Sequence, residues 1–124
     1  MGLTLVVYNL HLESRGDDNL RVTQLKEVLG DVASYKPRLP ALVAGDLNCD
    51  ISGGQAPKLI EQAGFRNILG QSRSPTTPGR GLLGNGRSID WALVSGPVEV
   101  SSTEVHSNVS ASDHYPISFT LRFS

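Results

Sequence analysis

The sequence contains a single cysteine, Cys49, and lacks long apolar runs. No intramolecular disulfide can form, which excludes a disulfide-stapled secreted scaffold, and we expect a cytoplasmic location. Every apolar run is broken within about eight residues, well short of the roughly 20 that a transmembrane helix needs, so we expect no membrane span. No basic stretch followed by an apolar run marks a signal peptide.

An excess of charge of one sign is also missing, because the formal net charge is −1 at pH 7. The chain as a whole is therefore not attracted to nucleic acid or to an anionic membrane, and any phosphate binding must come from local charge. The 124 residues suffice for one domain with one core, which we assign to 1–124. The 39% hydrophobic and 19% charged residues are ordinary for a globular protein.

The order of apolar segments predicts an α/β fold. Residues 3–12, LTLVVYNLHL, form a β-rich run typical of a strand that is buried on both faces. Residues 18–35 have helical apolar spacing, with Asp17 or Asp18 as the N-cap, and residues 41–48, ALVAGDLN, form a second strand that ends in a turn. A strand, a helix and a strand in this order predict a right-handed unit with parallel strands.

The remaining chain alternates short elements with one long loop. We expect a helix over residues 56–63 and strands over 88–94, 98–105 and 117–123. The loop over residues 66–87 is rich in Gly, Pro, Ser and Thr and contains no acidic residue. A loop of this length in a compact domain is more often functional than idle. It carries four arginines, namely Arg66, Arg73, Arg80 and Arg87.

Polar residues follow the apolar part of the first two strands. His11 ends the first strand, and Asp46 and Asn48 end the second. Ligand sites in open α/β sheets lie beyond the carboxyl ends of parallel strands, so we expect these three side chains to converge if the strands are neighbours. Taken singly, Asp46 and Asn48 also suit a turn, and His11 also suits a structural hydrogen bond.

Two further features bear on the same site. Asp90 lies in an apolar strand, and a buried carboxylate needs a partner, for which a histidine would serve. The segment SDHYP places Asp113 and His114 side by side, and a regular strand would point them to opposite faces. Because Pro116 cannot donate to a sheet ladder, we expect the pair in the turn that leads into the last strand.

Four motifs now support a family resemblance. NLHLES, AGDLN, SIDWALVS and SDHYPIS occur in this order over residues 9–118. They resemble the C-terminal motifs of the endonuclease/exonuclease/phosphatase superfamily, which has the deoxyribonuclease-I-like fold. The resemblance implies a phosphoesterase that uses Mg²⁺ or Mn²⁺.

The resemblance also implies roles for five catalytic residues. His11 would contact the scissile phosphate, and Asp46 and Asn48 would orient the attacking water and the phosphoryl oxygens. Asp90 would pair with His114, which would face the phosphate. Such groups suit the reaction, because attack on a phosphate ester places charge on non-bridging oxygens and needs an aligned water. Which group takes the proton from water is left open.

Metal and substrate contacts follow in the same way. Asp113, with help from Asp46, would hold the metal, since Mg²⁺ prefers oxygen ligands. The arginine-bearing loop suits phosphates, and we expect Asn9, Arg80 and Arg87 to contact a phosphate-ester substrate of unknown class.

The sequence also departs from the family pattern. The family fold is a four-layer αββα sandwich built from a chain about twice as long, whose N-terminal half supplies an asparagine and a metal-binding glutamate. Glu13 is poorly placed to substitute for that glutamate. We therefore expect half of the sandwich, with one mixed β-sheet and helices on one face, and weak metal binding. Helices on one face leave the other apolar face of this sheet uncovered, which predicts a homodimer or pairing with a complementary N-terminal half.

Two functional hypotheses follow. The first is a divalent-metal-dependent phosphoesterase domain, either a phosphodiesterase or nuclease or a phosphatase, that is truncated and inactive or weakly active alone. The second is a non-catalytic half-domain that acts as an assembly or binding module, which the missing glutamate favours. A serine hydrolase is excluded, because the sequence has no G-x-S-x-G nucleophile motif.

Overall fold

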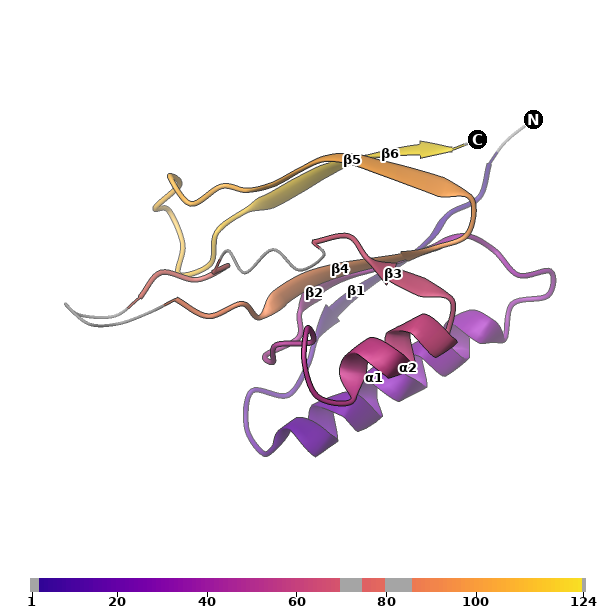
Figure 1. Cartoon of the computed structure of the whole chain (residues 1–124), viewed down its shortest axis with the longest axis horizontal. Helices are drawn as coiled ribbons and strands as arrows, with labels where there is room; N and C mark the ends of the chain where they lie inside the picture. The colour runs from indigo at the N-terminus through magenta and orange to yellow at the C-terminus, as the bar shows by residue number, and fades with distance from the viewer. Residues whose placement is uncertain (1–2, 70–74, 80–85, 124) are drawn as a thin grey trace.

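The computed structural model describes residues 3–69, 75–79 and 86–123. Figure 1 shows these residues in three layers, with a sheet between two helices on one side and a β-hairpin on the other. The elements are β1 (Val6–His11), α1 (Asp18–Ala33), β2 (Ala41–Asp46), α2 (Ala56–Gln62), β3 (Phe65–Asn67), β4 (Asp90–Ser95), β5 (Val98–Val105) and β6 (Ile117–Phe123). The α/β class is confirmed.

The larger sheet is mixed, as predicted, and has the strand order β1-β2-β4-β3. β1 runs parallel to β2, whereas β4 is antiparallel to both β2 and β3. The expectation of a single sheet needs correction, because β5 and β6 form a separate antiparallel pair. Both edges of β4 are already occupied by β2 and β3, so the strand that follows β4 has no free edge there and lies in another layer (Figure 1).

The helices cover one face of the larger sheet. In α1, Leu25, Leu29 and Val32 are buried in one core cluster with Val43 and Leu93 of the sheet. Asp17 is the N-cap of the two candidates, because its side chain accepts a hydrogen bond from the Leu20 amide at 3.2 Å. Helices on a single face, as predicted, leave the opposite face to the hairpin layer (Figure 1).

The first strand is not buried on both faces, contrary to the prediction. β1 is an edge strand whose residues alternate between half-buried and exposed. Tyr8 and Leu10 pack against the core, whereas Val7 on the other face is 60% exposed and Leu3 before the strand is 70% exposed. The sequence run is apolar on both faces, but only the helix face of β1 is covered.

The predicted long loop begins later than expected, because residues 65–67 form β3. Arg66 lies on this strand, and its guanidinium donates hydrogen bonds to the Val98 carbonyl at 2.7 Å and the Gly96 carbonyl at 3.3 Å. The Arg66 side chain therefore joins the two sheets. Arg73 lies outside the described residues.

Among the residues that are described, no helix is long and apolar enough to cross a membrane.

Candidate active site

Three of the predicted site residues form one row across adjacent strands. His11 of β1 is paired in register with Asp46 of β2, and Asp46 is paired in register with Asp90 of β4. Because paired residues in neighbouring strands point to the same face, the row presents one imidazole and two carboxylates side by side. The expected convergence of His11 with Asp46 is confirmed, and the antiparallel β4 adds Asp90 at its first residue.

Gly45 permits the close approach of β1 and β2 at this row. A Cβ atom on Gly45 would lie 2.0 Å from the Leu10 carbonyl oxygen, and the backbone has a positive φ of 140°. Only glycine fits without displacing one strand. The glycine of AGDLN therefore fixes the spacing that brings His11 next to Asp46.

Asp46 and Asn48 form the turn that follows β2. The Asn48 amide donates to Asp46 Oδ1 at 2.9 Å, and the Asn48 side-chain Nδ2 donates to the Leu12 carbonyl at 2.8 Å. Asn48 has a positive φ of 53°, which asparagine tolerates better than most residues. The turn interpretation of these residues is therefore correct, and it still leaves Asp46 Oδ2 directed at the site. The Asn48 amide group is occupied by the end of β1.

His114 completes the site from the segment before β6. Its Nδ1 lies 2.7 Å from Asp90 Oδ2, which is a hydrogen bond between partly buried groups. The hydrogen bond to Asp90 is the main cause that raises the pKa of His114 above its ordinary value. Burial opposes this shift, and the negative charges of Asp90, Asp46 and Asp113 add to it. The pairing of Asp90 with His114 that the resemblance implied is present.

Asp46 lies between two imidazole rings. Its Oδ2 is 3.5 Å from Nε2 of His114 and 3.7 Å from Nε2 of His11. Both separations exceed a hydrogen-bond length, so neither Nε2 atom is committed to the carboxylate. The His11 side chain is 75% exposed, whereas that of Asp46 is 21% exposed. The site is thus a shallow cluster open to a ligand on the His11 side.

Three side chains of this cluster could each offer one ligand to a metal ion. Asp46, Asp90 and His114 each offer one atom, and these atoms lie within 4.8 Å of one another. Asp113 lies outside this group; its side chain is exposed and accepts a hydrogen bond from the Ser112 hydroxyl at 3.3 Å. Carboxylate oxygens suit Mg²⁺ and Mn²⁺. Asp90 and His114 are already bonded to each other, so Asp46 is the least committed ligand of the three.

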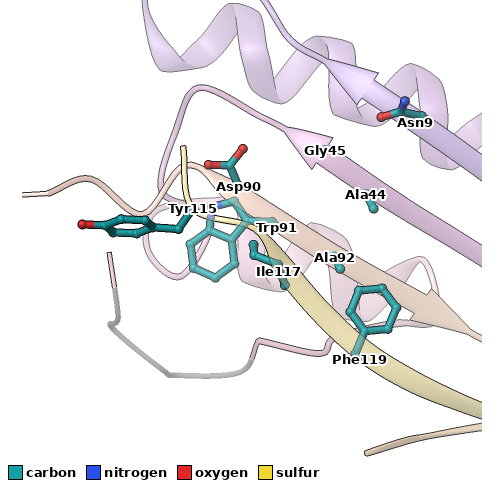
Figure 2. A pocket seen from close by; sticks show the side chains of 9 residues that line it. All are labelled: Asn9, Ala44, Gly45, Asp90, Trp91, Ala92, Tyr115, Ile117 and Phe119. Carbon is teal, nitrogen blue, oxygen red and sulfur yellow. The ribbon is translucent and has the colours of Figure 1, made fainter. Parts of the chain in front are cut away.

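The predicted substrate contacts are distributed around the site. Asn9 lines a cavity of about 250 Å³ between the sheet and the hairpin. Figure 2 shows the Asp90 carboxylate at one end of this cavity and the Phe119 ring at the other. Arg87 is exposed and lines a second cavity of about 660 Å³ that also touches Asn48. Arg80 lies outside the described residues.

Sequence reasoning missed Thr76, which is only 2% exposed. Its hydroxyl accepts hydrogen bonds from the backbone amides of Ile89 and Asp90, both at 3.1 Å. Its carbonyl accepts a hydrogen bond from the Tyr115 amide at 2.7 Å. Thr76 therefore bonds to the backbone of Asp90 and of the residue that follows His114. A threonine in a loop rich in Pro and Gly gives no sequence signal for such a position.

Comparison with known proteins places this geometry in a family. No curated protein matches the chain. Among solved structures, a conserved protein of unknown function from Enterococcus faecalis V583 is 20% identical, with a TM-score of 0.75 over 95% of this chain and 50% of that one. Mannosyl-6-phosphatase Bt3783 from Bacteroides thetaiotaomicron VPI-5482 is 21% identical, with a TM-score of 0.66 over 94% and 51%.

A third solved structure, D. rerio TDP2 complexed with a single-strand DNA product, is 17% identical, with a TM-score of 0.69 over 94% of this chain and 55% of that one. The chain spans about half the length of these structures. The family model of the endonuclease/exonuclease/phosphatase family matches residues 4–114. This match contains the predicted catalytic residues from His11 to His114, and the chain belongs to the endonuclease/exonuclease/phosphatase family.

Proposed function

We propose that this chain forms the catalytic half of a divalent-metal-dependent phosphoesterase. The observation that carries the proposal is the row of His11, Asp46 and Asp90 in register across three strands, with His114 hydrogen-bonded to Asp90. Family membership supports the reaction class. The row places two imidazole Nε2 atoms on either side of one carboxylate oxygen, where a phosphoryl group and a water molecule could be held together.

The residues of the chain divide the work as follows. Asp90 holds the His114 ring through Nδ1 and raises its pKa, which favours the imidazolium form, whose Nε2 proton can be donated to a non-bridging oxygen. His11, which is exposed beside Asp46, contacts the same phosphoryl group from the other side. Asp46 Oδ2 aligns the attacking water. Asn48 serves mainly to orient Asp46, because its amide groups are bonded to Asp46 and to the end of β1.

The cofactor in this proposal is Mg²⁺ or Mn²⁺, bound weakly. Asp46 and Asp113 would hold it, and it would supply charge neutralisation at the phosphoryl oxygens. The donor set fits such an ion only loosely, because Asp113 is exposed and is not among the three residues whose ligand atoms lie within 4.8 Å of one another. Few protein carboxylates leave most of the coordination to water, which is usual for Mg²⁺ and consistent with low affinity.

The substrate is a phosphate ester, and both diesters and monoesters are included in the proposal. The names of the structural neighbours cover a sugar phosphatase and a protein bound to single-strand DNA, and their low identity carries no substrate to this chain. Asn9 and Arg87, which line two different cavities, are the described candidates for substrate contact. Arg80 remains a prediction from the sequence. A cytoplasmic location is also kept as a prediction, which the single free cysteine supports.

Association completes the proposal. The face of β1 that points away from the helices is left open at Val7, and Leu3 beside it is also exposed. Apolar side chains on an open sheet face favour pairing with another protein surface. The partner is a second copy of the chain or a segment that supplies the half of the neighbours' length that this chain does not match.

One assay tests the proposed activity. Hydrolysis of bis-p-nitrophenyl phosphate and p-nitrophenyl phosphate is measured with and without Mg²⁺ or Mn²⁺ for the wild type, Asp46→Ala and His114→Ala. Asp50→Ala is the matched control, because Asp50 is an exposed acid whose carboxylate bonds only to Ser52 in the described residues. A metal-dependent rate that both site variants lose and the control keeps is the expected result.

The second candidate function is a non-catalytic assembly or binding module. The open face of β1 and the exposed position of Asp113 favour it. A wild-type rate no higher than that of Asp46→Ala, alone and after association, would establish this reading and overturn the catalytic one.

A further inference from the structure

Thr76 connects two segments of the site that are far apart in the sequence. All the hydrogen-bonding capacity of its hydroxyl is used, since it accepts from the Ile89 and Asp90 amides and donates to the Arg87 carbonyl at 3.1 Å. Its own backbone amide donates to the same carbonyl at 2.8 Å, and its carbonyl accepts from Tyr115 at 2.7 Å. One buried residue thus holds the start of β4 and the segment that carries His114.

The edge of β4 explains why the hydroxyl is needed there. β3 pairs with β4 only from Leu93 to Ser95, and the last bond on that side joins the Ile68 amide to the Ala92 carbonyl. β4 extends beyond this point to Asp90, where the strand edge has no further backbone neighbour in the described residues. The Thr76 hydroxyl takes over as the acceptor for this edge, at the residue whose side chain holds His114.

The packing around Thr76 is tight. Its segment lies against residues 86–87 so closely that a Cβ atom on Gly86 would stand 2.0 Å from the Thr77 carbonyl oxygen and 2.5 Å from Pro75 Cβ. A neighbour larger than glycine would separate the two segments. Thr77 shares this packing, and its hydroxyl accepts from the Arg87 amide at 2.9 Å, but it has no contact to Asp90 or Tyr115 among the bonds of the described residues.

We propose that Thr76 is a positioning residue that sets the geometry of the Asp90–His114 pair. It does so through two hydrogen bonds, one from the Asp90 amide to its hydroxyl and one from the Tyr115 amide to its carbonyl. The Thr76 hydroxyl fixes the backbone position of Asp90, from which the carboxylate extends. The Thr76 carbonyl fixes the backbone of Tyr115, the residue after His114. Its catalytic consequence rests on the proposed phosphoesterase function, whereas its effect on the His114 ring does not. Thr76 itself is buried and touches no substrate.

The variants separate the hydroxyl from the shape of the side chain. Thr76→Val keeps the volume and removes the acceptor, whereas Thr76→Ser restores it. Thr77→Val is the matched control, since it removes a neighbouring hydroxyl that, among the described residues, bonds only to Arg87. Thr76→Cys, with a weak acceptor in place of the hydroxyl, is the second variant if Thr76→Val does not fold. Circular dichroism and thermal unfolding confirm folding before any comparison.

The first readout does not need activity. With ¹⁵N-labelled histidine, the His114 Nδ1 proton bonded to Asp90 gives a downfield resonance that is assigned by its loss in Asp90→Asn. We expect this resonance in the wild type, Thr76→Ser and Thr77→Val, and expect it to be broadened or lost in Thr76→Val or Thr76→Cys. A resonance that stays sharp and unshifted in the folded Thr76→Val, or in Thr76→Cys where Thr76→Val does not fold, overturns the inference even if the wild type hydrolyses nothing.

The second readout is kinetic. We expect kcat for the phosphate ester to fall about 10- to 100-fold in Thr76→Val with KM nearly unchanged, because loss of a supporting hydrogen bond that misplaces a catalytic group by about 1 Å has effects of this size. Thr76→Ser should recover kcat to within about 3-fold, and Thr77→Val should keep it. A rise in KM with kcat preserved would overturn the positioning role, whereas absence of any wild-type rate would count against the proposed function alone.

Discussion

The Nδ1 atom of His114 lies 2.7 Å from Oδ2 of Asp90, which joins the segment before β6 to the first residue of β4. The two residues are 24 positions apart in the sequence. The bond leaves Nε2 of His114 directed toward Asp46, the neighbour of Asp90 in the sheet. The Asp90–His114 pair thus brings His114 next to β2 and β4, the strands that carry Asp46 and Asp90.

This pair makes a pH prediction. Asp90 raises the pKa of His114 above the ordinary value of about 6.5, so the protonated form that the mechanism uses persists to higher pH. We expect the rate to fall as pH rises through the raised pKa. In Asp90→Asn this fall in rate should begin at lower pH, and the maximal rate should be about 100-fold lower. A pH–rate profile of both proteins checks this, and a fall that begins at the same pH would show that another group controls it.

The same shift predicts how stability depends on pH. A group whose folded pKa is raised contributes stability that is fully present below its unfolded pKa and is lost as pH rises through the folded pKa. The wild type should therefore exceed Asp90→Asn in stability most clearly from about pH 5 to 6.5, and the difference should shrink at higher pH. Urea unfolding across this range measures it, and a difference that grows toward alkaline pH would contradict the assignment.

Much of this site could be predicted from the sequence, because its chemistry sits at strand ends. The parallel pairing of β1 with β2 and the shared face of His11 and Asp46 follow from alternation along each strand. The Asx turn at Asn48 follows from residue type. These features depend on neighbours in the sequence or on one strand pairing, and local patterns contain that information.

Other features could not be predicted, since they depend on which edges and faces are already occupied. The same apolar pattern suits a buried strand and an edge strand, so the open face at Val7 was missed. β6 alternates like any half-exposed strand, and the separation of β5 and β6 from the larger sheet depends on the occupied edges of β4. Thr76 acts through its backbone and hydroxyl at a strand edge created by distant residues.

Gly45 provides a test of strand spacing. In Gly45→Ala the new Cβ would meet the Leu10 carbonyl oxygen at 2.0 Å, so we expect a loss of about 2 kcal/mol in the free energy of unfolding. Gly30→Ala is the control, because a Cβ there meets nothing within 4 Å and alanine favours the helix. Chemical denaturation should show the control unchanged or more stable. Equal stability of Gly45→Ala and the wild type would mean that β1 moves freely relative to β2.

His11 provides a test of substrate contact without a change in the fold. Its side chain is 75% exposed and its Nε2 lies 3.7 Å from Asp46 Oδ2, beyond hydrogen-bond length, so His11→Ala should change the unfolding free energy by less than about 0.5 kcal/mol. Phosphate-ester turnover should fall at least about 10-fold if the ring contacts the phosphoryl group. His106→Ala is the control, since His106 bonds to Ser118 on the hairpin. Equal rates for His11→Ala and His106→Ala would remove His11 from the mechanism.

Metal dependence should be strong in activity and weak in affinity. Because Asp113 is exposed and Asp46 is the least committed ligand of the cluster, Mg²⁺ should bind with a low affinity that a modest excess of EDTA removes. Asp46→Asn and Asp113→Asn should each raise the Mg²⁺ concentration needed for half-maximal rate. Titration of rate against Mg²⁺ checks this. If Asp113→Asn leaves the titration unchanged, the ion is held by the cluster of Asp46, Asp90 and His114 and not by the exposed acid.

The open face of β1 makes the last prediction. Val7 is 60% exposed on a sheet edge strand, and burying such a side chain against a partner removes apolar surface from water at about 25 cal/mol per Å². Val7→Glu places a charge on this exposed face without touching the core, so association should weaken while the fold persists. Light scattering during size-exclusion chromatography measures the mass of both proteins across a concentration series. A dimer of the wild type that dissociates in Val7→Glu supports pairing of two copies through this face. A wild type that stays monomeric and becomes active only when the unmatched half of a neighbour is added supports the complementary segment instead.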